Sequence, residues 1–158
     1  MQASNIQEDT TYEENIYVWQ KDCIRRKSIV DDVQYTVQLG LPQGDWYVGK
    51  VGITFKVLEK PAGQDLHLDF RGTKIGRYFV NGEDAMAGGK KVFTGHKVIV
   101  PVNLLKVGEV NEIQVLIQNK YRNDSEGLHA FVDKTDNKQY IYTQFEPACA
   151  HYVFPCFD

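Results

Sequence analysis

The spacing of apolar residues divides the chain into a short first part and a long second part. Up to about residue 30, apolar side chains recur every three or four positions, as on one face of a helix. These side chains are Ile16, Trp19 and Cys23, extended by Val30. Thr10 and Glu13 have the spacing of a capping box at a helix start. The pattern predicts one N-terminal helix over about residues 11–30.

Three successive basic residues, Arg25, Arg26 and Lys27, lie near the end of this predicted helix. They could form a patch for a binding partner, or they could be a solvated helix end. The C-terminal end of a helix favours positive charge because the backbone dipoles leave partial negative charge there. We therefore prefer the interpretation as a solvated helix end.

After Asp31 the spacing of apolar residues becomes two, which is typical of strands with one buried face. The three clearest alternating sets are Val33, Tyr35, Val37, Leu39 and Leu41; Val51, Ile53, Phe55 and Val57; and Leu66, Leu68 and Phe70. Further strands are expected at "RYFV", "KVIVPV" and "NEIQVLIQNKY", with a turn at Asn81-Gly82 and a hairpin around "KTDNK". Short strands separated by turns predict an all-β, antiparallel β-sandwich over about residues 33–158. With the helix packed on it, residues 1–158 would form a single domain.

Composition narrows the classes of function. The chain has 158 residues and a net charge of −3, which argues against nonspecific nucleic-acid binding because that requires clustered basic residues. No apolar run approaches the roughly 20 residues of a membrane helix. The first residues are polar and acidic, unlike a secretory signal. Three cysteines, an odd number without zinc-ligand spacing, indicate reduced thiols. We expect a cytoplasmic protein with neither a nucleic-acid nor a membrane partner.

Motifs for catalysis and metal binding are missing from the sequence. The four histidines do not form an H-E-x-x-H motif, and "GEDAMAGGKKVF" departs from a phosphate loop because Asp84 stands where the first glycine belongs. There is no G-x-S-x-G motif. Cys149 and Cys156 have only His151 nearby in sequence as a base. We therefore predict no catalytic residue, no metal ligand and no cofactor in this chain.

The candidate binding residues are Gln144 and Glu146, near the end of the chain. They are two positions apart on a predicted strand, so their side chains should point to the same face. A carboxylate and an amide together can bind a cationic hydrogen-bonding group, such as the amino terminus of a peptide. The alternative is an exposed pair of polar residues at a strand end, and the pattern alone leaves both interpretations open.

The segment "EGLHAFVDKTDNKQYIYTQFEPACAHYVFPCFD", residues 126–158, resembles the end of the N-terminal domain of the aminopeptidase N family of zinc metallo-aminopeptidases. "DDVQYTVQLGL", "YVGKVGITFKV" and the helical segment are similar to earlier parts of that domain. The resemblance implies a β-sandwich that covers a separate thermolysin-like zinc domain. It also implies that Gln144 lines the pocket for the substrate's first side chain and that Glu146 binds the substrate's free α-amine.

The departures from the family concern the zinc chemistry. No segment matches the family's Gly-x-Met-Glu-Asn, its H-E-x-x-H or its distant glutamate ligand. His151-Tyr152 stands where an Arg-Arg-like pair is common, and the sequence ends at Asp158. Because zinc hydrolysis needs a bound metal and a carboxylate base, we expect the zinc catalytic domain to be absent and this chain alone to be inactive. Zinc is expected only in a separate catalytic domain.

Two hypotheses of function follow. In the first, the chain is the non-catalytic N-terminal domain of a zinc aminopeptidase and contributes the free-amine anchor to a cleft shared with the zinc domain. In the second, it is a catalytically dead relative that acts as a structural or interaction subunit of a larger assembly. A weaker third option is a small module that binds amino termini. Both leading hypotheses expect a protein partner, because the aromatic residues of the last stretch cannot all fit in one core. They are Tyr142, Phe145, Tyr152, Phe154 and Phe157.

Overall fold

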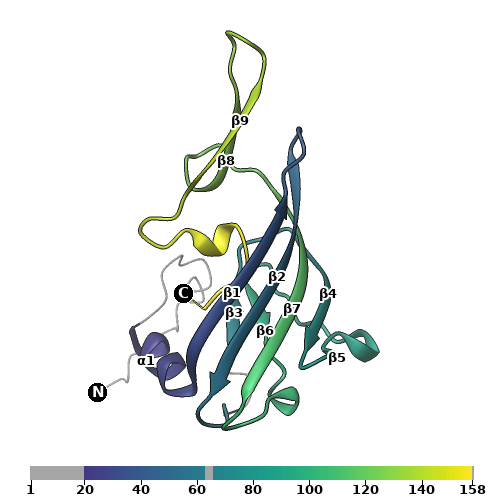
Figure 1. Ribbon diagram of the computed structural model, residues 1–158, viewed down its shortest axis with the longest axis vertical. Coiled ribbons are helices and arrows are strands. Elements are labelled where there is room, and N and C mark those ends of the chain that lie inside the picture. Colours follow the sequence, from purple (N-terminus) through teal and green to yellow (C-terminus); the bar gives the residue numbers. More distant parts are fainter. Residues whose placement is uncertain (1–19, 63–65, 158) are drawn as a thin grey trace, which may run out of the picture.

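The computed structural model describes residues 20–62 and 66–157 (Figure 1). Its α-helix and strands are α1 (Gln20–Ile29), β1 (Val30–Gly40), β2 (Trp46–Val57), β3 (His67–Asp69), β4 (Lys74–Val80), β5 (Glu83–Asp84), β6 (Lys97–Ile99), β7 (Val110–Lys120), β8 (Gly127–Val132) and β9 (Gln139–Gln144). Short 3₁₀ helices occupy Ala87–Gly89, Val102–Leu104 and Ala150–Tyr152.

The strands form one large sheet and two small ones. The large sheet has five antiparallel strands in the order β1-β2-β7-β4-β5. The two-stranded β3–β6 sheet lies on one face of it, and the two-stranded β8–β9 hairpin projects from one end (Figure 1). The predicted all-β sandwich with antiparallel pairing and an N-terminal helix is confirmed.

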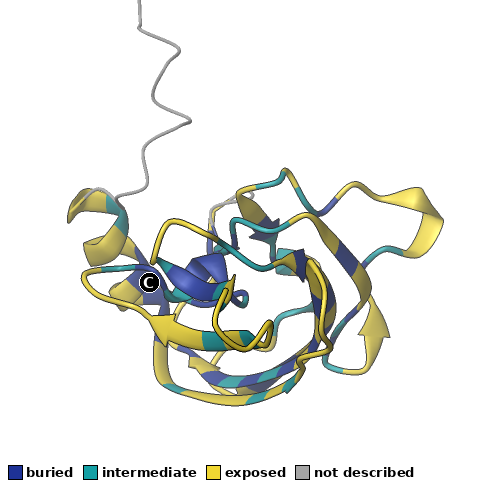
Figure 2. Cartoon of the chain, turned by 90° about the horizontal axis from the view of Figure 1, so that it is seen from above, coloured by how far each residue is buried: buried dark blue, intermediate teal, exposed yellow. Residues whose placement is uncertain are grey.

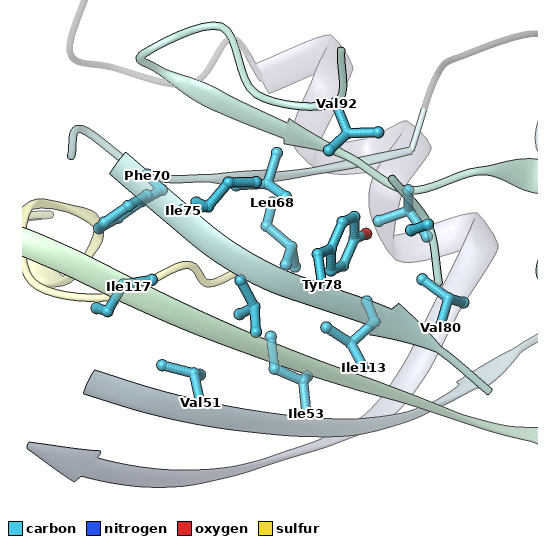
Figure 3. Close-up of a cluster of buried hydrophobic side chains, with 14 of the residues drawn as sticks. Val51, Ile53, Leu68, Phe70, Ile75, Tyr78, Val80, Val92, Ile113 and Ile117 are labelled. Atoms are coloured by element: carbon cyan, nitrogen blue, oxygen red, sulfur yellow. The ribbon is translucent and has the colours of Figure 1, made fainter. Parts of the chain in front are cut away.

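The core lies between the large sheet and the β3–β6 layer, as the period of two predicts. Along β2 and β7, buried and exposed residues alternate (Figure 2). Ile53 pairs with Ile113 in the large sheet, and both meet side chains such as Leu68 from the opposite layer (Figure 3). The predicted inward residues of β2 and of the segment around β3 are buried, with exposed fractions of 0–1%: Val51, Ile53, Phe55, Val57, Leu66, Leu68 and Phe70.

The edge strand β1 is less buried than its sequence suggests. Val33, Val37 and Leu39 are only partly buried, whereas Tyr35 and Leu41 are exposed. In the large sheet β1 pairs with β2 alone, so its inward face lies at the margin of the sandwich. The predicted strand is confirmed, but its half-buried face is wrong at the two exposed positions.

The helix differs from the sequence-based expectation in the residues that it buries. Residues 10–19, which include the capping box, Ile16 and Trp19, lie outside the described residues. Cys23 is exposed, and the helix turns Arg26 and Ile29 inward instead. Val30 is buried as the first residue of β1, so the strand begins three positions before the predicted start of the sandwich at residue 33. The expected apolar stripe is therefore wrong at Cys23.

The predicted turn at Asn81-Gly82 joins β4 to β5. Both residues have positive φ, 52° for Asn81 and 83° for Gly82, as a two-residue hairpin turn of type I′ requires. The glycine-rich segment that follows contains the 3₁₀ helix Ala87–Gly89.

Within residues 20–62 and 66–157, the structure has no helix with the length and apolar character needed to cross a membrane.

Candidate functional site

Gln144 and Glu146 lie where the β8–β9 hairpin ends. Gln144 is the last residue of β9 and pairs with Gly127 of β8. Glu146 does not continue the strand as predicted, because the chain turns over residues 146–149. The backbone N–H of Cys149 donates to the carbonyl of Phe145 (2.7 Å) and closes this turn. The shared strand face expected for the two side chains is thus wrong for Glu146, although both residues remain close along the chain.

Both candidate side chains are available to a ligand. Gln144 and Glu146 are exposed. Across the described residues, neither side chain takes part in a hydrogen bond or an ion pair, with each other or with a third group. An anionic oxygen without an internal partner is suited to bind an ammonium group. The two residues thus lie close together at the end of the β8–β9 hairpin, but no hydrogen bond links their side chains.

The segment after Glu146 is held on the sandwich by buried hydrogen bonds. The hydroxyl of Tyr47 donates to the carbonyl of Val153 (2.8 Å), and the side-chain amide of Asn119 donates to the carbonyl of Tyr152 (3.0 Å). Burial raises the pKa of Tyr47 to about 12, so its hydroxyl keeps the proton that it donates. These bonds fix the backbone that follows the Glu146 turn.

Backbone pairing adds a further attachment. Asp69 and Cys156 exchange two backbone hydrogen bonds, of 2.8 and 3.0 Å, so the last residues extend the β3–β6 layer. The N–H of Arg71 donates to the carbonyl of His151 (2.8 Å). The Glu146 turn therefore lies between two fixed supports, the β8–β9 hairpin before it and the clamped terminal segment after it.

The aromatic residues of the last stretch divide between core and surface. Tyr152 is buried with an exposed fraction of 5%, and Phe154 and Phe157 are partly buried against the core. Tyr142 and Phe145 remain 43% and 37% exposed. The expectation that these residues do not all fit in one core agrees with this division.

One face of the hairpin carries aromatic rings that lead to Gln144. The register pairs His129 with Tyr142 and Phe131 with Tyr140, and alternation places Gln144 on that same face. The rings are in contact: 4.8 Å between the centroids of His129 and Tyr142, and 5.6 Å between those of Phe131 and Tyr140. The Nδ1 atom of His129 accepts from the N–H of Ser125 (2.9 Å), so the ring proton of the neutral form is on Nε2. The sequence pattern predicted the hairpin but not this face.

A buried ionic cluster, also missed from the sequence, ties α1 to the same terminal segment. Arg26, 7% exposed, donates from Nη1 to Oδ2 of Asp69 (2.7 Å), and its Nη2 lies 3.2 Å from Nε2 of His67. Burial raises the pKa of Asp69, but the hydrogen bond with His67 and the charge of Arg26 outweigh it and leave the pKa below its usual value. The interpretation of residues 25–27 as a solvated helix end is therefore wrong for Arg26.

The described residues do not fit a zinc ion. Residues 20–62 and 66–157 contain no cluster of three or more histidine, cysteine, aspartate or glutamate side chains that could hold a metal. Cys149 is buried, and its Sγ lies 3.8 Å from the carbonyl of Glu146. That this chain binds no metal or cofactor stays a prediction.

These features define a β-sandwich domain whose C-terminal corner exposes an amide and a carboxylate beside an aromatic hairpin. The sequence model of the family described as the Peptidase M1 N-terminal domain matches residues 32–158. The chain belongs to this family, the N-terminal domain family of the aminopeptidases N.

A curated relative is the Aminopeptidase N of Streptomyces lividans. It is 32% identical to this chain over 130 residues, which cover 82% of the chain and 14% of the relative. The chain thus spans only a small part of the length of the relative that it matches.

Proposed function

We propose that this chain is the non-catalytic N-terminal domain of a zinc aminopeptidase. It contributes Glu146, and beside it Gln144, to a cleft that is completed by a separate zinc domain. Glu146 binds the free α-amine of a peptide, and Gln144 borders the space for the first side chain. None of the three cysteines forms a disulfide, which favours the cytoplasm as its compartment.

The observation that carries this proposal is the pair of exposed polar side chains on a fixed turn. Glu146 has no internal partner among the described residues, yet the backbone after it is clamped to the sandwich by buried groups. Because the backbone beside Glu146 is already ordered, binding an ammonium group has to order little more than the side chain, and a covering domain would strengthen the attraction by excluding water.

The second candidate function is a catalytically dead relative that serves as an interaction subunit. The exposed rings of Tyr140 and Tyr142 favour it, because exposed aromatic faces usually mark an interface. The two functions differ in the role of Glu146. Only the first requires its charge.

The test is to combine the chain with a zinc-domain partner and to compare an aminoacyl substrate with its N-acetylated analogue. We expect Glu146→Gln to raise KM for the free-amine substrate about thirtyfold, equivalent to about 2 kcal/mol. Gln144→Ala should do less and mainly alter the preference for the first side chain.

Glu109→Gln is the matched control, because Glu109 is an exposed carboxylate in the loop before β7. It should leave both substrates unaffected. If Glu146→Gln also leaves the discrimination between amine and acetyl intact, the anchor role fails and the interaction-subunit function takes its place.

A further inference from the structure

A small pocket opens on the outer face of the large sheet, which is the face opposite the β3–β6 layer. Four residues from β4, the β4–β5 turn and β7 line it: Phe79, Gly82, Glu112 and Gln114. Neighbours such as Val80 and Ile113 point into the core (Figure 3), so the residues that alternate with them point outward. The pocket has a volume of about 240 Å³, which suits one small group or the end of a side chain, because pockets for drug-sized ligands measure about 300–1,000 Å³.

The walls of the pocket are fixed by Asn81, the residue before Gly82 in the β4–β5 turn. The N–H of Asn81 donates to the carbonyl of Glu112 (2.8 Å), and its Oδ1 accepts from the N–H of Glu112 (2.9 Å). Its Nδ2 donates to the carbonyl of Leu104 (2.7 Å) and to Oδ1 of the buried Asn111 (2.8 Å). The turn and the backbone of Glu112 are therefore joined, and the pocket is formed before any ligand binds.

The polar atoms of the pocket are mainly acceptors. Nε2 of Gln114 donates to Oε1 of Glu112 (2.8 Å), which orients the carboxylate. The bond leaves Oε2 of Glu112 and Oε1 of Gln114 as acceptors for a ligand. Among the described residues Glu112 makes no ion pair, so its charge is not neutralised. Phe79 pairs with Gln114 across the two strands and adds an aromatic ring to the wall.

We propose that this pocket binds a guanidinium group, carried either by a small guanidine or by an arginine side chain of another polypeptide. A guanidinium group is flat, always charged and rich in N–H donors without an acceptor. It can donate to the oxygens of Glu112 and Gln114 while its flat face lies on the ring of Phe79. The pocket lies away from the β8–β9 hairpin, so the proposal does not depend on the amine anchor at Glu146 (Figure 1).

The test is a titration of the full, ¹⁵N-labelled chain followed by NMR. The probe is Nα-acetylarginine methylamide, whose only charge is the guanidinium group. We expect it to shift the backbone amide signals of Gly82, Glu112 and Gln114 more than those of the rest of the chain. The lysine counterpart, which has charge but no flat group, should bind about threefold more weakly. The citrulline counterpart, which is flat but neutral, should bind at least about fivefold more weakly.

Three variants assign the binding to these side chains. Glu112→Gln keeps the size, removes the charge and should weaken the arginine probe at least about fivefold. Phe79→Leu keeps an apolar side chain without a flat ring and should weaken it about threefold. Glu83→Gln is the matched control, because Glu83 is an exposed carboxylate of the same hairpin that does not line the pocket. It should change the affinity less than about twofold. Unchanged NMR signals outside the pocket show that each variant folds.

A last comparison identifies the source of the guanidinium group. Methylguanidine represents a small guanidine, and alanyl-arginyl-alanine with both ends blocked represents a polypeptide. Tighter binding of the peptide assigns the pocket to an arginine side chain, whereas equal or tighter binding of methylguanidine assigns it to a small molecule. Equal affinities for the arginine, lysine and citrulline probes, signal shifts outside the pocket only, or full affinity in Glu112→Gln would overturn the proposal.

Discussion

Strands β2 and β9 have similar alternating sequences but very different surroundings. In β2 every second side chain from Tyr47 to Val57 is buried, because β1 and β7 flank the strand and the β3–β6 layer covers its inner face. In β9 no residue is buried, because the strand pairs with β8 alone and has no such layer across from it. Alternation thus predicts a strand, whereas burial depends on whether the same chain supplies the second layer.

This difference separates a region with a covered apolar face from one whose rings are partly exposed. The two layers of the sandwich bury each other's apolar side chains, and all buried side-chain polar atoms of the described residues have hydrogen-bond partners. In the hairpin, the rings of Phe131, Tyr140 and Tyr142 stay 43–45% exposed, although His129 beside them is buried. Substitutions of core residues in the sandwich should therefore lower the free energy of unfolding more than substitutions of these exposed rings.

The largest effect is expected in the core. Phe55 is fully buried, and its ring lies 5.3 Å from that of Phe157 in the clamped terminal segment. Phe55→Ala should lower the free energy of unfolding by about 4 kcal/mol, because it removes apolar contacts and leaves a cavity. Urea unfolding followed by circular dichroism measures this. Lys56→Ala, at the exposed neighbouring position, should change it by less than about 0.5 kcal/mol. Equal effects at both positions would contradict the core assignment.

The next effect concerns the ionic cluster that ties α1 to the sandwich. Asp69→Asn should cost about 3 kcal/mol at neutral pH, because it removes the charge from a buried ion pair with Arg26.

The pH dependence gives this prediction a second readout. Since the pKa of Asp69 is depressed in the folded state, its contribution is present above the unfolded pKa of about 4 and is lost as the pH falls through the lower folded value. The wild-type chain should therefore lose stability below about pH 4 more steeply than Asp69→Asn. Parallel acid-unfolding curves for the two proteins would show that Asp69 is not the titrating group.

Sequence reasoning succeeded where a local pattern determines the structure. Alternation located β2, β7 and the hairpin, and the Asn81-Gly82 pair located a turn. It failed where contacts between segments far apart in the sequence determine which residues are buried. Arg26 is buried, and Asp69, 43 residues away, accepts a hydrogen bond from it. Asn119 is buried because it binds the carbonyl of Tyr152, 33 residues on.

The candidate site shows the same limit. The composition of "TQFEP" suggested a cation-binding corner, but the turn that removes Glu146 from the strand depends on how the terminal segment attaches to the sandwich. Local spacing alone cannot reveal that attachment. The roles of Gln144 and Glu146 stay predictions until their binding is measured.

An intermediate effect is expected at the junction of the two regions. Gly127, the first residue of β8, has φ of +63°, and a Cβ atom there would lie 2.9 Å from Cβ of Tyr152. Gly127→Ala should cost about 2 kcal/mol because of this contact and the left-handed backbone. Gly82→Ala is a useful control: its φ is also positive, but no atom lies within 4 Å of the added Cβ. A smaller loss for Gly82→Ala in the same urea assay would isolate the packing component.

The smallest effect on stability is expected at Phe131 in the β8–β9 hairpin. Phe131 is 45% exposed and contacts mainly Tyr140 and His129 of its own hairpin. Phe131→Ala should lower the free energy of unfolding by only about 0.5 kcal/mol, the typical value of one cross-strand pair. Phe55→Ala removes the same side chain from the sandwich and should cost about 4 kcal/mol. The comparison is informative because both substitutions are Phe→Ala in antiparallel strands. If Phe131→Ala proves as costly as Phe55→Ala, the Phe131 ring must be packed by the chain as closely as a core residue, which its 45% exposure excludes.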